Sequence, residues 1–209
     1  MSKHYFKNVP NIRYKNPQSD IVDNDNYVVI KNLFLRAKLR DDVYSAVTFL
    51  QSYTIEEGMR PDNVAGEVYG NDELDWVILV TANIVNVRSE WPMSSNVLYK
   101  YAEEKYGLAL NEIRHYETEE VRNAEGKLIL PAGQIVDKDF EIPNPLVFNT
   151  NINPVIGVTN FLAETRENEK KRNIKIMRKE YLTMFMMDMK DALEYTKSSQ
   201  FISSTLKDS

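Results

Sequence analysis

One stretch of twenty residues limits the fold of this chain more than any other. Residues 61–80 read PDNVAGEVYGNDELDWVILV, and they predict two short helices that are separated by a Gly-Asn pair. The first helix has one apolar stripe, whereas the second is apolar on almost every side. A helix of the second kind must be enclosed by other parts of a structure. Because two such short helices cannot enclose each other, strands or another chain must cover the faces that remain.

Local signals mark the ends of both predicted helices. Pro61 suits the first helical position, where its missing N–H would have no partner in any case. Gly70 is placed to end the first helix in the left-handed conformation. Asn71 or Asp72 then caps the second helix, whose first turn is acidic, as its dipole favours.

Composition excludes several classes of protein. The chain has 209 residues, 43% of them hydrophobic, a net charge of -5 and no cysteine. This is enough apolar material for a core, but a nucleic-acid-binding protein usually has a basic face. The start of the chain lacks the apolar region of a secretory signal, and the most apolar stretch, residues 76–85, is far shorter than the ~20 residues of a membrane span. We therefore expect a soluble intracellular protein that binds neither nucleic acid nor membrane.

The N-terminal part gives mixed signals. Residues 1–26 are polar and rich in turn formers, and their scattered aromatic residues indicate either an arm that docks on a partner or a disordered terminus. Residues 27–39 combine strand and helix patterns, and we favour a helix from about Ile30. Residues 43–55 are rich in β-branched and aromatic residues and predict a strand.

The second half of the chain alternates clear and unclear segments. We expect a helix over 94–107 with Val97, Leu98, Tyr101, Ala102 and Tyr106 inward, a β-hairpin or a short meander over 112–136 with a turn at residues 123–126, and a loop over 137–156. The charge run at 164–172 is typical of a solvated face, and 173–177 predicts a strand. Residues 180–197 predict a helix with Leu182, Phe185, Met186, Met189 and Leu193 on its main stripe.

Methionines widen the apolar surface of this last helix. Met184 and Met187 lie outside its main stripe. Methionine fills gaps in a core, but it also adapts to irregular partner surfaces. Both interpretations stay open, and the second makes Met184 and Met187 candidate interface residues.

No arrangement of residues predicts catalysis. His4 and His115 lack a metal-binding spacing, there is no glycine-rich phosphate loop and no GxSxG motif, and a cysteine nucleophile is absent. Adjacent carboxylates such as Glu103-Glu104 and Glu119-Glu120 point in different directions on a helix or strand. We expect no catalytic residue, no cofactor and no metal. An enzyme of unrecognised type is the weakest alternative.

The order of elements around the helix pair resembles the LysM pattern. Residues 53–84 read YTIEEGMRPDNVAGEVYGNDELDWVILVTANI, which is a Tyr-bearing strand, a glycine turn, a helix that ends in Tyr-Gly and a helix that ends in Asn. In LysM folds the two helices pack on one side of a two-stranded antiparallel sheet. The resemblance implies an α+β protein with a small LysM-like βααβ core, a long insertion and extended terminal segments.

The resemblance also requires a closing strand. A helix intervenes where that strand is expected, but NIKIM at 173–177 has the right alternation. We predict that Ile174–Met177 pairs antiparallel with Tyr53–Ile55. The resulting division is an N-terminal arm and connecting element (1–42), the LysM-like core (43–92), an insertion (93–172), and the closing strand with the Met-rich helix (173–209).

A second resemblance spans much of the chain. The motifs are Arg60-Pro61, Tyr69-Gly70-Asn71, Trp76, Asn83, Trp91, and Asn168-Glu169-Lys170 with Arg172, Ile174 and Lys175. In this order they resemble the gene-53 baseplate wedge subunits of T-even-type contractile-tailed bacteriophages. This implies a non-enzymatic structural protein of the virion, assembled in the host cytoplasm. Its partners would be other wedge and tail proteins in a hetero-oligomer, which it would help to close into a ring.

The residue patterns and the two resemblances together assign roles to particular residues. The expected core anchors are Tyr53, Tyr69, Gly70, Trp76, Ile78, Asn83 and Ile174. The expected partner-interface residues are Tyr5, Phe6, Tyr14, Trp91, Met184 and Met187, with the core as the alternative for Trp91.

The alternative function is a LysM-type peptidoglycan-binding module, possibly part of a lytic enzyme. Its sugar would lie against the loops Glu57–Pro61 and Asn83–Ser89. The Gly-Asp-Thr that is usual after the first strand is replaced by Gly58-Met59-Arg60-Pro61, which argues against glycan binding.

Overall fold

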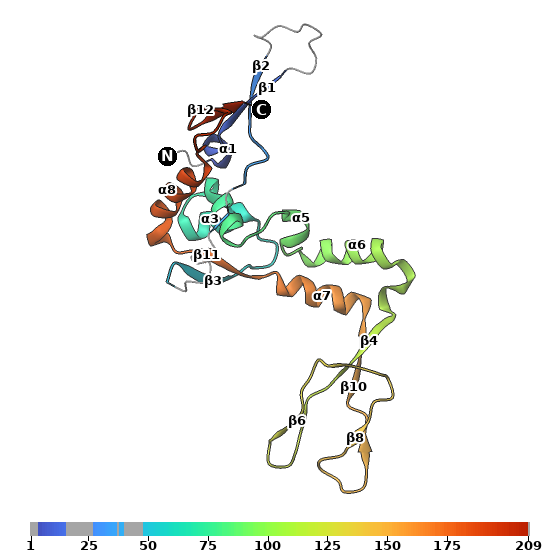
Figure 1. Cartoon of the computed structure of the whole chain (residues 1–209). Coiled ribbons are helices and arrows are strands. Elements are labelled where there is room, and N and C mark those ends of the chain that lie inside the picture. Colours follow the sequence, from blue (N-terminus) through green and yellow to red (C-terminus); the bar gives the residue numbers. More distant parts are fainter. Residues whose placement is uncertain (1–3, 16–26, 37, 40–47, 209) are drawn as a thin grey trace. The chain divides into compact units, whose positions relative to one another are not determined.

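The computed structural model describes residues 4–15, 27–36, 38–39 and 48–208, which form mixed α and β structure (Figure 1). The predicted α+β class is confirmed. The chain divides into two compact units: unit 1 comprises Met1–Trp91 and Arg172–Ser209, and unit 2 is the continuous segment Pro92–Lys171. The sequence-based division into four segments with separate roles stays a prediction.

Unit 1 contains the helix pair and the largest core of the described chain. Its elements in chain order are α1 (Tyr5–Asn8), β1 (Asn11–Lys15), β2 (Tyr27–Lys31), β3 (Leu50–Thr54), α3 (Pro61–Tyr69), the 3-10 helix η1 (Asp72–Leu74), α4 (Asp75–Thr81), α5 (Val87–Glu90), β11 (Asn173–Met177), the 3-10 helix η3 (Lys179–Tyr181), α8 (Leu182–Leu193), β12 (Phe201–Ser203) and β13 (Leu206–Asp208).

A two-stranded antiparallel sheet joins distant parts of the sequence in unit 1. β3 pairs with β11 in a register that places Tyr53 opposite Ile174 and Leu50 opposite Met177. The predicted antiparallel pairing is confirmed, although β3 ends at Thr54 rather than at residue 55. Of the strand predicted over 43–55, residues 43–47 lie outside the described part of the chain.

The helix pair packs over this sheet. α3 and α4 contact each other, and α4 also contacts β11. The predicted enclosure of the second helix is confirmed, because Val77 and Ile78 are fully buried, as is Ile176 on β11. The predicted helix ends are also confirmed: Pro61 begins α3, and Gly70 ends it with a φ of 74°, where a side chain would be strained. Asn71 caps the following turn, which is the 3-10 helix η1 before α4 begins.

A second sheet of unit 1 has the strand order β12-β13-β1-β2. β1 pairs in parallel with β13 and antiparallel with β2. Across the parallel pair, the guanidinium of Arg13 donates two hydrogen bonds, of 2.5 and 3.0 Å, to the carboxylate of Asp208. The helix predicted from about Ile30 is wrong, because Ile30 lies within β2 and every residue of that strand pairs with β1. Residue 37, which belonged to the expected helical stripe, lies outside the described part.

α8 completes the core of unit 1. Phe185, Met189 and Leu193 are buried, and Leu182 and Met186 pack against the same core. The predicted stripe of this helix is therefore confirmed. Among the helices that the described residues form, none combines the length and apolar character that a membrane span requires.

Unit 2 places two helices beside a set of short strands. Its elements are α6 (Ser95–Tyr106), the 3-10 helix η2 (Gly107–Asn111), β4 (Ile113–Thr118), β5 (Val121–Arg122), β6 (Leu128–Leu130), β7 (Ile135–Val136), β8 (Ile142–Pro143), β9 (Asn151–Ile152), β10 (Val155–Thr159) and α7 (Asn160–Lys170). β10, β4 and β7 form one antiparallel sheet, while β5–β6 and β8–β9 are separate hairpins (Figure 1).

Predictions for unit 2 were right in part. The helix over 94–107 and the hairpin turn at residues 123–126 are confirmed. Leu98 and Ala102 face inward, but the inward positions predicted for Val97 and Tyr101 are wrong, because both side chains are exposed. The loop predicted over 137–156 instead contains the β8–β9 hairpin. The charge run lies largely in α7, a helix that the sequence pattern did not reveal.

Candidate partner-binding surfaces

Trp76 lies where three elements of unit 1 meet. Its ring centroid is 5.7 Å from that of Tyr5 on α1 and 6.0 Å from that of Phe185 on α8. Trp76 itself is buried. The N-terminal segment is thus held on the core of its own chain through Tyr5, while the neighbouring Phe6 remains exposed. Tyr14, the third aromatic residue assigned to the arm, is exposed on β1.

A cavity of about 680 Å³ opens beside Trp76. Tyr5 and Phe6 contribute aromatic rings to its wall, and Asp72, Glu73 and Asp75 contribute carboxylates. His4 lies at its edge, with its Nε2 3.6 Å from Oε1 of Glu73. Among the described residues, no group of three His, Cys, Asp or Glu side chains could hold a metal ion. The cavity therefore offers aromatic faces and negative charge, which suit a cationic side chain.

Trp91 lies in the core rather than on the surface. Its ring is buried, and its indole N–H donates a hydrogen bond of 2.8 Å to the carbonyl of Met59. A buried indole N–H needs such a partner, and here the chain supplies it internally. The sequence left Trp91 open between interface and core, and the structure places it in the core of unit 1.

Two tyrosines connect the helix pair to the sheet. Tyr69 donates a hydrogen bond of 2.8 Å to the carbonyl of Met177, and its burial raises the pKa of its hydroxyl. Tyr53 donates a hydrogen bond of 2.8 Å to Glu67. Burial and this hydrogen bond raise the pKa of Tyr53 to about 12. Both hydroxyls are therefore neutral donors at any physiological pH.

The remaining expected anchors lie around the same core. Ile78 is fully buried, and Ile174 is partly buried against the core cluster. Asn83 has a positive φ of 57°, a conformation that asparagine tolerates better than most residues. Its Oδ1 accepts a hydrogen bond of 3.3 Å from Arg36. Gly70 provides the left-handed end of α3.

α8 has an apolar outer face beside a second cavity. Met184 and Met187 are exposed, whereas Phe185 and Met189 on the same helix are buried. A cavity of about 350 Å³ lies next to Met184. Its wall combines apolar side chains with Lys38, Asp188 and Asp191. The structure thus presents both methionines outward, and their contact with a partner stays a prediction.

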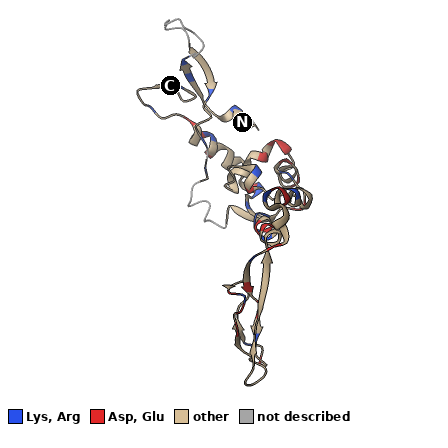
Figure 2. Ribbon diagram, turned by 90° about the vertical axis from the view of Figure 1, so that its right-hand side faces the viewer, with Lys and Arg blue, Asp and Glu red and all other residues tan. Residues whose placement is uncertain are grey.

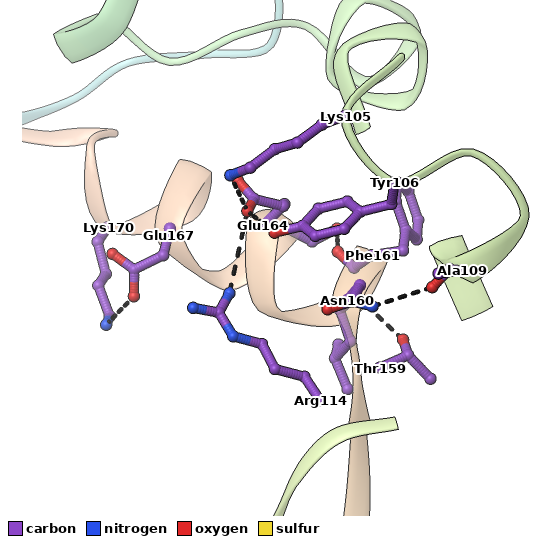
Figure 3. A network of polar contacts seen from close by, with 12 residues as sticks. Lys105, Tyr106, Ala109, Arg114, Thr159, Asn160, Phe161, Glu164, Glu167 and Lys170 are labelled. Carbon is purple, nitrogen blue, oxygen red and sulfur yellow. Dashed lines mark hydrogen bonds and ion pairs between the residues drawn. The ribbon is translucent and has the colours of Figure 1, made fainter. Parts of the chain in front are cut away.

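Unit 2 is held together by a polar network around Glu164 (Figure 3). Glu164 Oε1 accepts hydrogen bonds from Lys105 Nζ at 2.8 Å and from the hydroxyl of Tyr106 at 2.7 Å. Burial opposes ionisation of Glu164, but these bonds outweigh it, so the pKa of Glu164 is below its ordinary value. Nearby, Asn160 Nδ2 donates a hydrogen bond of 2.9 Å to the carbonyl of Ala109. The network fixes α7 against α6 and η2.

The sequence predictions missed apolar surface residues of unit 2. Leu108 on η2 is fully exposed, and Leu146, Val147 and Phe148 are exposed in the turn between β8 and β9. Leu146, Val147 and Phe148 lie in the segment 137–156, for which the sequence predicts a loop, and Leu108 directly follows the predicted helix over 94–107. The triplet Leu-Val-Phe inside an Asn- and Pro-rich stretch is a signal that could have revealed the residues of the turn.

In the part of the chain that the structure describes, charge does not single out any surface as a nucleic-acid site. Lys and Arg as well as Asp and Glu residues are dispersed along the ribbon (Figure 2). Several of these charges pair locally, such as Arg166 with Glu117 at 2.6 Å and Lys170 with Glu167 at 2.6 Å. The surfaces described so far combine apolar or aromatic side chains with a few charges, which suits binding to another protein.

Comparison with known proteins connects these surfaces to a biological setting. The model of the family described as Base plate wedge protein 53 matches residues 9–129, which is more than half of the chain. This chain belongs to that family. It is also 27% identical over 203 residues to baseplate wedge protein gp53 of Enterobacteria phage T4, covering 90% of this chain and 88% of the relative.

Family membership confirms the resemblance that the sequence motifs indicated. The chain is a structural component of the baseplate in a phage tail, and it works together with other baseplate proteins. The match to the family model includes the helix pair, Trp76 and Trp91, and it ends before the β8–β9 hairpin.

Proposed function

We propose that this chain joins wedge subunits and helps neighbouring wedges close into the baseplate ring. Its action is adhesive and non-catalytic: apolar side chains that are exposed in the free chain become buried against other wedge proteins. The proposal deepens the structural baseplate role that the family match supplies.

One observation carries the proposal: ordered elements of both units present large apolar side chains outward. Examples are Met187 on α8 and Phe6 on α1 in unit 1, and Leu108 and Phe148 in unit 2. Single exposed apolar residues are ordinary, but groups of them on ordered elements mark interaction sites. Stable interfaces bury on the order of 1,200–2,000 Å² in total, so several such surfaces would act together.

Ring closure provides the direct test. Wedge proteins of the same phage are produced together with and without this chain, and the products are counted by negative-stain electron microscopy. Without the chain, we expect separate wedges that do not form rings. When the chain is added, we expect these wedges to close into rings. Rings that close at normal yield in its absence would contradict the proposal.

A matched pair of variants tests the adhesive mechanism. Met184→Gln with Met187→Gln removes the apolar outer face of α8 and leaves its buried face intact. We expect fewer closed rings with this double variant. Val87→Gln changes another exposed apolar residue of unit 1, outside the proposed surface, and should leave ring yield unchanged.

A LysM-like core is the second element of the proposal. The order β3, α3, α4, β11, with antiparallel pairing of the two strands, supports it. If this chain bound peptidoglycan in the way of a LysM module, the glycan would lie against residues 57–61 and 83–89. In this chain Arg172 pairs with Glu57, and the carbonyl of Met59 accepts the hydrogen bond of Trp91, so internal contacts occupy the first of these loops.

Peptidoglycan binding separates the two functions. We expect the purified chain to remain in solution when insoluble peptidoglycan is sedimented, while a LysM protein of known glycan affinity is retained. If this chain instead sediments with peptidoglycan, and soluble chitin or peptidoglycan fragments release it, the result would favour a peptidoglycan-binding module over a protein that joins wedge subunits.

A further inference from the structure

The turn between β8 and β9 has an unusual combination of order and exposure. We name residues 144–150 the β8–β9 tip. Leu146, Val147 and Phe148 all point into solvent, and Phe148 is 90% exposed. Large apolar side chains at this exposure lose water-exposed area only when another molecule covers them.

Hydrogen bonds fix the backbone of the β8–β9 tip. Asn144 Oδ1 accepts from the amides of Leu146 at 2.9 Å and Val147 at 3.3 Å. The amide of Asn144 donates to the carbonyl of Thr150 at 2.8 Å, and the hydroxyl of Thr150 donates to the carbonyl of Val147 at 3.0 Å. Because these bonds form without a partner, binding would immobilise little additional backbone.

Charge is absent from the β8–β9 tip and concentrated beside it. No Asp, Glu, Lys or Arg occurs between residues 142 and 163. Asp137, Asp139 and Glu141 precede this stretch, with Lys138 as the positive charge among them. Interface cores are typically depleted of charge and enriched in aromatic residues, with a polar rim around them. The β8–β9 tip has this composition on a small scale. Glu141 supplies an acidic group at its base, where its Oε2 accepts a hydrogen bond of 3.1 Å from Asn151 on β9.

We propose that the β8–β9 tip inserts into an apolar pocket with a basic rim on another wedge protein. Phe148 and Leu146 are the anchors, and Asn144 is a positioning residue. The inference rests on the proposed function, and it names the surface of unit 2 that makes one of the wedge contacts.

Charge argues against a second copy of this chain as the occupant. Both cavities described above have more acidic than basic residues on their walls: Asp72, Glu73 and Asp75 beside Arg36, and Asp188 and Asp191 beside Lys38. The acidic residues next to the β8–β9 tip would be repelled by either cavity. A pocket lined by Lys or Arg on a different protein would attract them.

The test measures binding of the full-length chain to each other wedge protein of the same phage, produced and purified one at a time. The double variant Leu146→Ser/Phe148→Ser should bind one of them about 30-fold more weakly, or worse, because buried aromatic anchors carry most of an interface's affinity. Ile135→Ser is the matched control. It removes another exposed aliphatic side chain from the same unit and should change the affinity by no more than about threefold.

Two further variants distinguish the roles within the tip. Asn144→Ala leaves the apolar side chains in place but removes the bonds that order them, and we expect an intermediate loss of affinity. Glu141→Lys should weaken binding most at low salt, because it reverses a rim charge. Thermal melting of the double variant and of Glu141→Lys should match wild type, since their altered side chains are exposed.

The outcomes separate this inference from the proposed function. If the double variant binds every wedge protein as wild type does, the tip inference fails and the wedge-joining role stands. If wild type binds no wedge protein and rings close without it, both fail. If light scattering shows a dimer of wild type that the double variant does not form, the occupant is a second copy and the inference is overturned.

Discussion

At the scale of single residues, the stability of unit 1 depends on polar groups that the core must satisfy. The carbonyl of Met177, at the end of β11, accepts its hydrogen bond from the hydroxyl of Tyr69, and this contact is buried. A buried carbonyl that loses its donor leaves a desolvated group without compensation. Tyr69 therefore contributes more than its ring to the contact between helix and sheet.

Replacing Tyr69 tests this directly. Tyr69→Phe should lower the free energy of unfolding by about 1–3 kcal/mol, because the Met177 carbonyl is left unpaired. Tyr53→Phe is the matched control. Its hydroxyl bonds to Glu67 in an exposed setting, so the loss should be about 0.5 kcal/mol. Urea unfolding followed by tryptophan fluorescence measures both, and equal losses in the two variants would contradict the explanation.

At the scale of elements, the contact between α6 and α7 depends on an ionised Glu164. The pKa of Glu164 lies below its ordinary value in the folded protein. A group of this kind stabilises the folded state above its unfolded pKa, ~4.3 for glutamate, and that contribution is lost as pH falls through the folded pKa. Protection of the α6 and α7 amides from hydrogen exchange should therefore decrease on acidification below about pH 4.3.

The variant Glu164→Gln isolates this effect. At pH 7 we expect it to lower the local stability of α6 and α7 by roughly 1–2 kcal/mol, and the difference from wild type should shrink in acid. Glu167→Gln is the control on the same helix, since its pair with Lys170 is exposed and contributes at most about 0.5 kcal/mol. A difference from wild type that stays constant between pH 7 and pH 3 would exclude Glu164 as the titrating group.

Elements with strong end signals were predictable from sequence, and elements without them were not. Pro61 and Gly70 marked α3 because each residue type has a backbone preference that suits its place. The β8–β9 hairpin was missed because each of its strands has only two residues. In addition, β8 contains Pro143, and proline normally argues against a strand. α7 was missed because its second half is dominated by charge, which hides the apolar positions in its first turn.

The exposed residues of the candidate surfaces were likewise predictable only where a local sequence pattern determines which side chains face outward. Met184 and Met187 could be identified because helical periodicity separates an outer face from a core face. Phe148 could not, since its exposure depends on a turn whose conformation is set by the side chain of Asn144. Pairing of β3 with β11 was predictable only through the LysM resemblance, because no local pattern connects strands so far apart.

At the scale of the whole molecule, the two compact units should respond to substitution separately. Both tryptophans, Trp76 and Trp91, belong to unit 1, so fluorescence reports on that unit. We expect Tyr69→Phe to shift the fluorescence transition without changing hydrogen exchange in α6 and α7. Glu164→Gln should do the reverse. If each variant shifted both signals equally, the units would unfold as one.

The pairing of β3 with β11 also has a consequence for how the chain is made. Thr54 and Asn173 face each other although 119 residues separate them. At bacterial translation rates of roughly 5–20 residues per second, a ribosome needs about 6–24 s to synthesise the segment between them. During that interval α4 lacks β11, the strand that it contacts, while unit 2 can complete its internal contacts as it is made because it is one continuous segment. The nascent chain therefore exposes the apolar surface of α4 to water until β11 is made, and a chaperone that shields this helix would raise the yield of folded protein.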